Sequence, residues 1–301
     1  MADYHPLRSE DQNPTNAAYD LLNSNAECRA KKCRTARMPS LTHLGLRDYD
    51  DVYEPSDDTY LLIDAIGFDI DEKTLNKEEN NHAVNEYDRQ EMITLEIGCG
   101  TGVPTVYLAM RLLGIVNDGR DVSSSKEVER AVTDATIISS EQHITHYITD
   151  INPHAIRIAK STAEVNGVPM SDIKAFNCDL ASDVIHKLRS KVDILIFNPP
   201  YVPTPNEEVG SSGIEASWAG GTNGRVVLDR ALPQIAQLLS FPNGVAYVVV
   251  VDDNYPEQIA QLMFDRHGIQ VVPWLRRRAR NEFLTVLKMT TTRIFSVDGT
   301  T

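Results

Sequence analysis

The sequence has few cysteines, no long apolar run and a shortage of basic residues. Its four cysteines are scattered without histidines at metal-ligand spacing, so we expect free thiols and no metal site. No window approaches about 18 uninterrupted apolar residues and the start lacks a basic-then-apolar signal, which indicates a cytoplasmic protein, with the nucleus as a second location. Lys and Arg total 29 against 43 Asp and Glu, and this formal net charge of −14 disfavours a dedicated nucleic-acid binder.

A single basic cluster interrupts this acidic composition. It is the run RRRAR at Arg276 to Arg280. We predict a solvated turn between two late strands, with a local basic patch as the alternative, because net charge does not exclude such a patch.

The 301 residues divide by composition into an extension, one domain and a tail. Residues 1–40 mix charges, Asn, Ser and Pro without periodicity, so we predict a disordered extension. The predicted domain covers residues 41–290, and residues 291–301 form the tail. Two polar stretches, about 69–91 and 117–143, are predicted to be loops inserted between its elements.

Strands and helices alternate through the domain. Apolar runs predict seven strands, at 93–98, 145–151, 173–180, 192–198, 244–252, 269–277 and 281–289. Helical patterns separate most of them, whereas the last two strands are too close for a crossover helix. We therefore predict an α/β fold with a doubly wound, mostly parallel seven-stranded sheet and an antiparallel edge hairpin. The strand at 173–180 is predicted to form an edge of the sheet.

The first strand ends in a glycine-rich turn, LEIGCGTGV, with Glu96, Gly98, Gly100 and Gly102 at two-residue spacing. A dinucleotide fingerprint would need glycine where Val103 stands, and a P-loop would need a following lysine. The spacing fits instead a turn that binds the amino-acid end of S-adenosylmethionine. Glu96 is then the candidate partner for the ammonium group.

The next two strands also end in acidic residues. Asp150 is placed to accept the two ribose hydroxyls of a nucleoside, and Asp179 the exocyclic amine of an adenine. Each carboxylate alone is typical of a solvent-facing loop. Three at consecutive strand ends predict one cofactor site.

The fourth strand ends in NPPY, formed by Asn198, Pro199, Pro200 and Tyr201. Two prolines fix two φ angles and remove two backbone donors, so a stiff turn is the simplest interpretation. Beside a cofactor site, the Asn198 carboxamide oxygen and the Pro199 carbonyl can accept both N–H bonds of an –NH2 group. That geometry would hold the nitrogen in line with the methyl group. Tyr201 can lie against the flat group.

These segments resemble the HemK/PrmC-type N5-glutamine methyltransferases, in particular the eukaryotic release-factor enzymes. The resemblance covers about residues 49–289, and it depends on VYEPSDDTYLLIDA, LEIGCGTG, TDINPHA, FNPPYVPTPNEEVGSSGIEASWAGGTNGR and EFLTVLK. It implies a Rossmann-like class I methyltransferase fold. It also implies cofactor contacts at Thr59, Glu96, Gly98, Asp150, Asp179, Leu180 and Asn198, and substrate contacts from Asn198 through Tyr201 to Val202. Thr59 and Leu180 follow from the resemblance alone.

The resemblance further implies a substrate and a partner. Such enzymes methylate the glutamine of the Gly-Gly-Gln loop in a class I release factor, and some accept protein lysine. They work as heterodimers with a small zinc-binding activator subunit, for which the edge strand at 173–180 is the natural docking place. We expect the glycine-rich loop around Trp218 to close over the target side chain, with a merely flexible crossover as the alternative.

Two other functions fit parts of the sequence. A nucleic-acid N6-adenine methyltransferase would offer NPPY the same –NH2 group, but no recognition domain or broad basic face is evident. A non-enzymatic scaffold would not need the intact acidic residues and NPPY.

Overall fold

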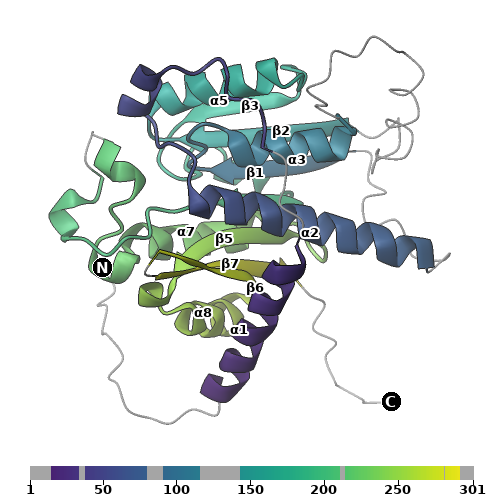
Figure 1. The fold of residues 1–301 in the computed structure, drawn as a ribbon, viewed down its shortest axis with the longest axis vertical. Helices are drawn as coiled ribbons and strands as arrows, with labels where there is room; N and C mark the ends of the chain where they lie inside the picture. Colours follow the sequence, from purple (N-terminus) through teal and green to yellow (C-terminus); the bar gives the residue numbers. More distant parts are fainter. Residues whose placement is uncertain are drawn as a thin grey trace.

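The computed structural model describes residues 15–33, 38–79, 91–115, 143–210, 214–280 and 282–291. Its strands form one seven-stranded sheet in the order β3-β2-β1-β4-β5-β7-β6 (Figure 1). The strands are β1 (Glu91–Ile97), β2 (His143–Asp150), β3 (Ile173–Asn177), β4 (Ile194–Phe197), β5 (Val245–Val251), β6 (Ile269–Ala279) and β7 (Glu282–Thr291). The helices are α1 (Thr15–Lys32), α2 (Asp57–Glu79), α3 (Val103–Leu113), α5 (Pro153–Val165), α6 (Ile185–Leu188), α7 (Val226–Leu238) and α8 (Pro256–His267).

The sheet topology confirms the predicted fold. β1 pairs in parallel with both β2 and β4, so the strand order reverses between them. β7 lies antiparallel between β5 and β6, as the last part of a hairpin. β3 forms one edge, as the sequence predicted. Ligands bind in such sheets at the carboxyl ends of the strands where the order reverses, which places the candidate site after β1 and β4.

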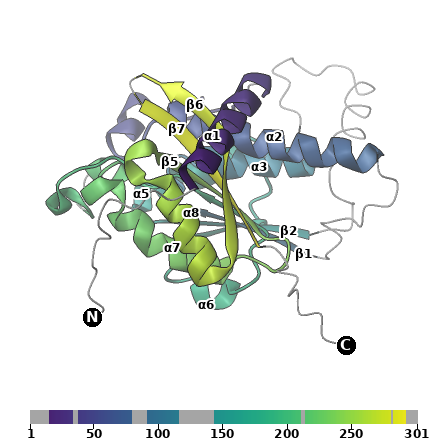
Figure 2. The same ribbon diagram turned by 90° about the horizontal axis from the view of Figure 1, so that it is seen from below.

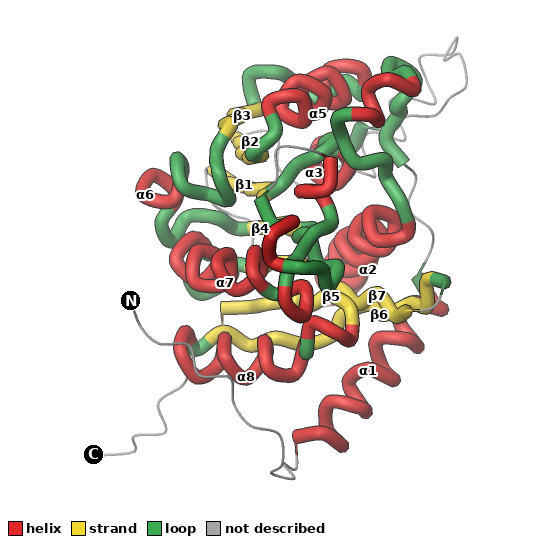
Figure 3. Tube along the Cα trace, turned by 90° about the vertical axis from the view of Figure 1, so that its left-hand side faces the viewer, coloured by secondary structure: helices red, strands yellow, loops and turns green. Residues whose placement is uncertain are grey.

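Helices cover both faces of the sheet. α2, α3 and α5 lie on one side, and α6, α7 and α8 on the other (Figure 3). The inner strand β5 is buried along its whole length because both faces are covered. Its Val245, Tyr247 and Val249 pack on the α2 side, and the alternate residues pack toward α7.

The N-terminal extension contains an ordered helix, so the prediction of disorder was wrong for Thr15–Lys32. Helix α1 lies along the edge strand β6 (Figures 1 and 2). Arg29 donates from Nε to the Trp274 carbonyl at 2.7 Å and from Nη2 to the Pro273 carbonyl at 2.8 Å. These carbonyls flank an irregularity in the β6–β7 register. The helix covers exposed backbone groups of an edge strand through polar contacts, so its sequence shows little apolar periodicity.

The first polar insertion is partly helical. Helix α2 continues to Glu79, which corrects the prediction of a loop from residue 69, and β1 begins at Glu91. Residues 80–90, nearly all of the second insertion (117–143) and nearly all of the tail lie outside the described residues. The prediction of loops is not tested there.

Only the end of the basic cluster is a solvated turn, because Arg278 and Arg280 are exposed and Arg280 lies in the turn between β6 and β7. Arg276 and Arg277 belong to β6, and Arg276 is only 8% exposed. Arg276 pairs with Asp252 at 2.6 Å, and Arg277 pairs with Asp64 of α2 at 2.8 Å. These arginines are therefore used inside the fold and do not form a free basic patch.

Membrane spans, cysteines and metal ligands were examined by sequence, and the described residues add the following observations. None of their helices is long and apolar enough to cross a membrane. All four cysteines are free thiols, and the described ranges contain no group of three or more metal-ligating side chains.

Candidate active site

A cavity of about 320 Å³ opens at the carboxyl ends of β1, β2 and β4, with the segment after β3 on its wall. Its lining includes most of the predicted site residues: Thr59, Glu96, Gly98, Gly100, Asp150, Asp179, Leu180, Asn198 and Pro200. The lining does not include four further predicted residues, which are Gly102, Pro199, Tyr201 and Val202. The topology therefore gathers residues that are more than 100 positions apart in the sequence.

The glycines of the first turn have two different roles. All three have positive φ, at +66° for Gly98, +50° for Gly100 and +78° for Gly102. A Cβ on Gly100 would meet no atom within 4 Å, whereas one on Gly102 would lie 2.8 Å from Cα of Ala159 in α5. Gly100 thus leaves room in the cavity, and Gly102 permits close packing of α3 against α5.

Asp150 connects the first two strand ends. Its Oδ2 accepts a hydrogen bond from the Gly100 amide at 2.9 Å, and its Oδ1 accepts one from the Asn152 amide at 2.8 Å. Burial raises the pKa of Asp150, while these backbone amides act in the opposite direction. The carboxylate is held rigidly at the cavity wall, where its remaining lone pairs can accept ligand hydroxyls.

Glu96 is fully buried at the base of the cavity. Its Oε2 accepts from the amide and the hydroxyl of Thr105, at 3.0 and 2.5 Å. Burial raises the pKa of Glu96 to about 8, and the Asp150 charge acts in the same direction. A cationic group bound beside Glu96 would favour its ionised form. The site is therefore suited to an ammonium ligand.

Asp179 forms an ion pair that the sequence did not predict. Its partner is Arg230 of α7, and both side chains line the cavity about half exposed. The adjacent Leu180 has a φ of +52°, which is uncommon for a branched side chain. Strained backbone of this kind occurs at ligand sites, where the surrounding structure holds it in place.

Asn198 presents an acceptor without a partner. Its Nδ2 donates to Asp58 at 3.1 Å, and its Oδ1 is buried without a hydrogen-bond partner among the described residues. A buried acceptor without a hydrogen bond is costly, and a bound –NH2 group would satisfy it. The sequence analysis did not predict Asp58, Tyr53 or Arg230 at the site. Asp58 was missed because an acidic residue in the first turn of a helix is ordinarily interpreted as a capping group.

Hydrogen bonds from the glycine-rich loop and from Asn254 hold the NPPY turn and the residue that follows it. The Val202 amide donates to the Trp218 carbonyl at 3.0 Å, and the Val202 carbonyl accepts from Gly220 at 2.9 Å. The Tyr201 carbonyl accepts from Nδ2 of the buried Asn254 at 2.9 Å. The glycine-rich loop therefore pairs with the turn, and its Val209, Gly210, Ala216 and Ser217 line the cavity.

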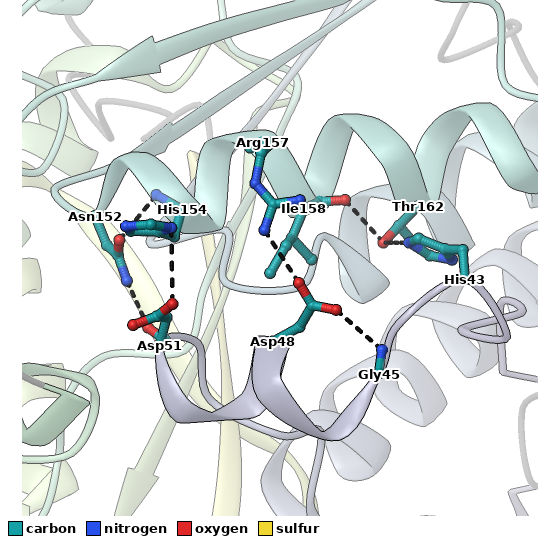
Figure 4. Close-up of polar contacts among 9 residues, drawn as sticks. All are labelled: His43, Gly45, Asp48, Asp51, Asn152, His154, Arg157, Ile158 and Thr162. Carbon is teal, nitrogen blue, oxygen red and sulfur yellow. Dashed lines mark hydrogen bonds and ion pairs between the residues drawn. The ribbon is translucent and has the colours of Figure 1, made fainter.

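A short segment before α2 docks on α5 (Figure 4). The 3-10 helix η1 (Leu46–Asp50) carries Asp48, which binds Arg157 at 3.1 Å and the Gly45 amide at 2.9 Å. Nδ2 of Asn152 donates to the Asp51 carbonyl at 2.7 Å. Val52 and Tyr53 follow directly after these contacts in the sequence, and both line the cavity. The segment thus forms one wall of the site.

Comparisons with known proteins identify methyltransferases among the relatives of this chain. No family model matches the chain. The human protein "Methyltransferase HEMK2" is 38% identical over 248 residues, 82% of this chain and 94% of its own length. The "eRF1 methyltransferase catalytic subunit mtq2" of Schizosaccharomyces pombe is 31% identical over 83% of this chain and 94% of its own length.

One solved structure has a related description. The "Structure of E. cuniculi Mtq2-Trm112 complex responible for the methylation of eRF1 translation termination factor" is 22% identical with a TM-score of 0.45, covering 80% of this chain and 99% of that chain. A TM-score this low supports no further argument. Because the human and S. pombe relatives are more than 30% identical to this chain over 94% of their own length, the chain belongs to the HEMK2 family of methyltransferases.

Proposed function

We propose that this enzyme transfers a methyl group from S-adenosylmethionine to the side-chain nitrogen of a glutamine in the Gly-Gly-Gln loop of a class I release factor. The observation that supports this most is the buried, unpartnered Oδ1 of Asn198 beside the cavity. The name of the S. pombe relative supports the substrate. A Methanocaldococcus jannaschii relative, 27% identical over 64% of this chain, is named "Putative protein N5-glutamine methyltransferase MJ0928".

The described residues fit this cofactor. Acidic side chains line one cavity at three strand ends, and Gly100 leaves the space above the turn open. In the proposed arrangement Glu96 binds the ammonium group, Asp150 the ribose hydroxyls and Asp179 the adenine amine. The cofactor supplies an electrophilic methyl group on its sulfonium.

The protein orients the acceptor nitrogen. An amide nitrogen is a poor nucleophile while its lone pair is conjugated with the carbonyl. Oδ1 of Asn198 and the carbonyl of Pro199 accept its two N–H bonds, so the lone pair is directed toward the methyl group. The nitrogen loses a proton during or after transfer, so no side chain has to remove one beforehand.

A methyl-transfer assay tests the proposal. The enzyme, purified with its partner, is offered radiolabelled S-adenosylmethionine with release factor, a lysine-containing protein, DNA or RNA. We expect label on the release factor and loss of label when its Gly-Gly-Gln glutamine is replaced by alanine. Asn198→Ala should abolish transfer while cofactor affinity largely survives. Preferential labelling of DNA or RNA would refute the proposed substrate.

We propose further that the chain works with a small zinc-binding subunit docked at the β3 edge. The S. pombe relative is named a catalytic subunit, which supports the existence of a second subunit. β3 is an edge strand among the described residues, and Met170, in the turn before it, is 38% exposed. Met170→Asp should weaken co-purification of the subunit. Phe264→Asp is the matched control, since Phe264 is 53% exposed on α8, away from this edge.

A further inference from the structure

Asp58 is at the centre of a hydrogen-bond cluster beside the NPPY turn. It lies in the first turn of α2 and is only 3% exposed. Its Oδ2 accepts from Nδ2 of Asn198 at 3.1 Å, from the Tyr201 hydroxyl at 3.2 Å and from the Tyr53 hydroxyl at 3.2 Å. Its Oδ1 accepts from the Thr59 amide at 2.6 Å. One carboxylate therefore contacts both the NPPY turn and the start of α2.

The two phenols in this cluster act as donors. Burial, with the Asp58 charge as the next cause, raises the pKa of Tyr53 to about 12 and raises the pKa of Tyr201 further. Both hydroxyls therefore keep their protons near neutral pH. These donors and the Thr59 amide thus contact both oxygens of the Asp58 carboxylate.

The cluster determines which end of the Asn198 amide faces the substrate. An ionised carboxylate accepts hydrogen bonds and cannot donate one, so it selects the amide orientation with Nδ2 toward Asp58. The opposite orientation would put the carbonyl oxygen against the carboxylate and leave the donor on the reaction side. With Nδ2 held, Oδ1 is the atom left without a partner.

We propose that Asp58 is a positioning residue that orients the Asn198 carboxamide so that Oδ1 accepts a hydrogen bond from the substrate –NH2 group. This inference depends on the function proposed above. It assigns to Asp58 an effect on the chemical step and not on cofactor binding, although its neighbour Thr59 lines the cofactor cavity.

Asp58→Asn tests this role. The Thr59 amide should hold the new side-chain oxygen, which turns the new NH2 group toward Asn198. Asn198 would then flip and present a donor to a substrate that also offers donors. We expect kcat to fall by about 100-fold or more, the size of effect seen when a single transition-state hydrogen bond is lost. Cofactor affinity and thermal midpoint should change little. Asp57→Asn is the matched control, because it removes the same charge from the adjacent exposed position.

A swapped pair makes the test independent of folding defects in the single variant. In Asp58→Asn with Asn198→Asp, the new amide donates to one oxygen of the new carboxylate, and the other oxygen again offers an acceptor to the substrate. The swap should be at least about tenfold more active than either single variant, a difference of about 1.4 kcal/mol in transition-state stabilisation.

The outcomes separate the two proposals. Unchanged kcat in Asp58→Asn would refute the positioning role while the proposed function stands. A swapped pair no more active than the single variants would refute it as well. A wild-type enzyme that does not label the release factor would overturn the proposed function, and the role of Asp58 with it.

Discussion

Two glycines of the first turn should respond differently to the same substitution. Gly100 and Gly102 both have positive φ and stand two residues apart, but a Cβ at Gly102 would lie 2.8 Å from backbone and side-chain atoms of Ala159. A Cβ at Gly100 would meet no protein atom within 4 Å. We therefore compare Gly102→Ala with Gly100→Ala.

The magnitudes follow from the two environments. A left-handed conformation costs alanine about 1–2 kcal/mol, and reduced freedom of the unfolded chain recovers about 0.4–1 kcal/mol. Gly100→Ala should therefore lower the free energy of unfolding by about 1 kcal/mol. Gly102→Ala adds an overpacking cost of about 1–3 kcal/mol, because backbone atoms of α5 cannot move aside easily. Its total loss should be about 2–4 kcal/mol.

Urea unfolding and thermal melting measure this difference. Each kcal/mol shifts the thermal midpoint of a chain of this size by about 2–4 °C, so the extra cost of about 1–3 kcal/mol should make Gly102→Ala melt about 2–12 °C below Gly100→Ala. Titration with S-adenosylmethionine should show the reverse order, since only the Gly100 methyl group would occupy ligand space. Equal stability losses in the two variants would refute the packing role of Gly102.

Three further predictions concern other parts of the fold. Arg29→Ala removes two hydrogen bonds to β6 carbonyls and should lower the free energy of unfolding by about 1.5–3 kcal/mol in urea titrations, whereas the exposed Lys31→Ala should have little effect. Because burial raises the pKa of Glu96 to about 8, the protonated form of Glu96 favours the folded state. Its contribution to the free energy of unfolding is fully present below about pH 4.5 and is lost as the pH rises to about 8. Glu96→Gln should remove a slope of at most about 1.4 kcal/mol per pH unit from unfolding curves between pH 5 and 8, and parallel curves for the two proteins would contradict this. Asn254→Ala should loosen the Tyr201 carbonyl and lower kcat, with a stability loss of about 1–3 kcal/mol, while Asp253→Ala at the adjacent exposed position should leave kcat unchanged.

The strands and most helices of the domain could be predicted because local patterns specify them. β5 consists of consecutive apolar residues, since helices cover both faces of the sheet. The ends of β1, β2 and β4 could be assigned to one site because parallel strands bring their carboxyl ends to the same side of a sheet. This reasoning placed Glu96, Asp150 and Asn198 at one cavity, and the structure shows them there.

Contacts between distant segments could not be predicted in this way. Helix α1 packs through Arg29 on backbone carbonyls of β6, and carbonyls have no sequence signature. Arg276 and Arg277 have the appearance of a surface cluster until their partners Asp252 and Asp64 are brought beside them. Gly102 resembles Gly100 in the sequence, and only the position of α5 separates their roles.

The sequence by itself determined the class of fold, the chemistry of the strand ends and the likeness to a methyltransferase family. These follow from periodicity and from motifs, which are properties of short segments. Only the tertiary structure decided which atom of the Asn198 amide is hydrogen-bonded and which is left without a partner among the described residues. The orientation of the Asn198 amide depends on Asp58, which is 140 positions away and contacts it because α2 packs across the sheet beside the end of β4. A hydrogen bond between such distant residues exists only once the chain has folded.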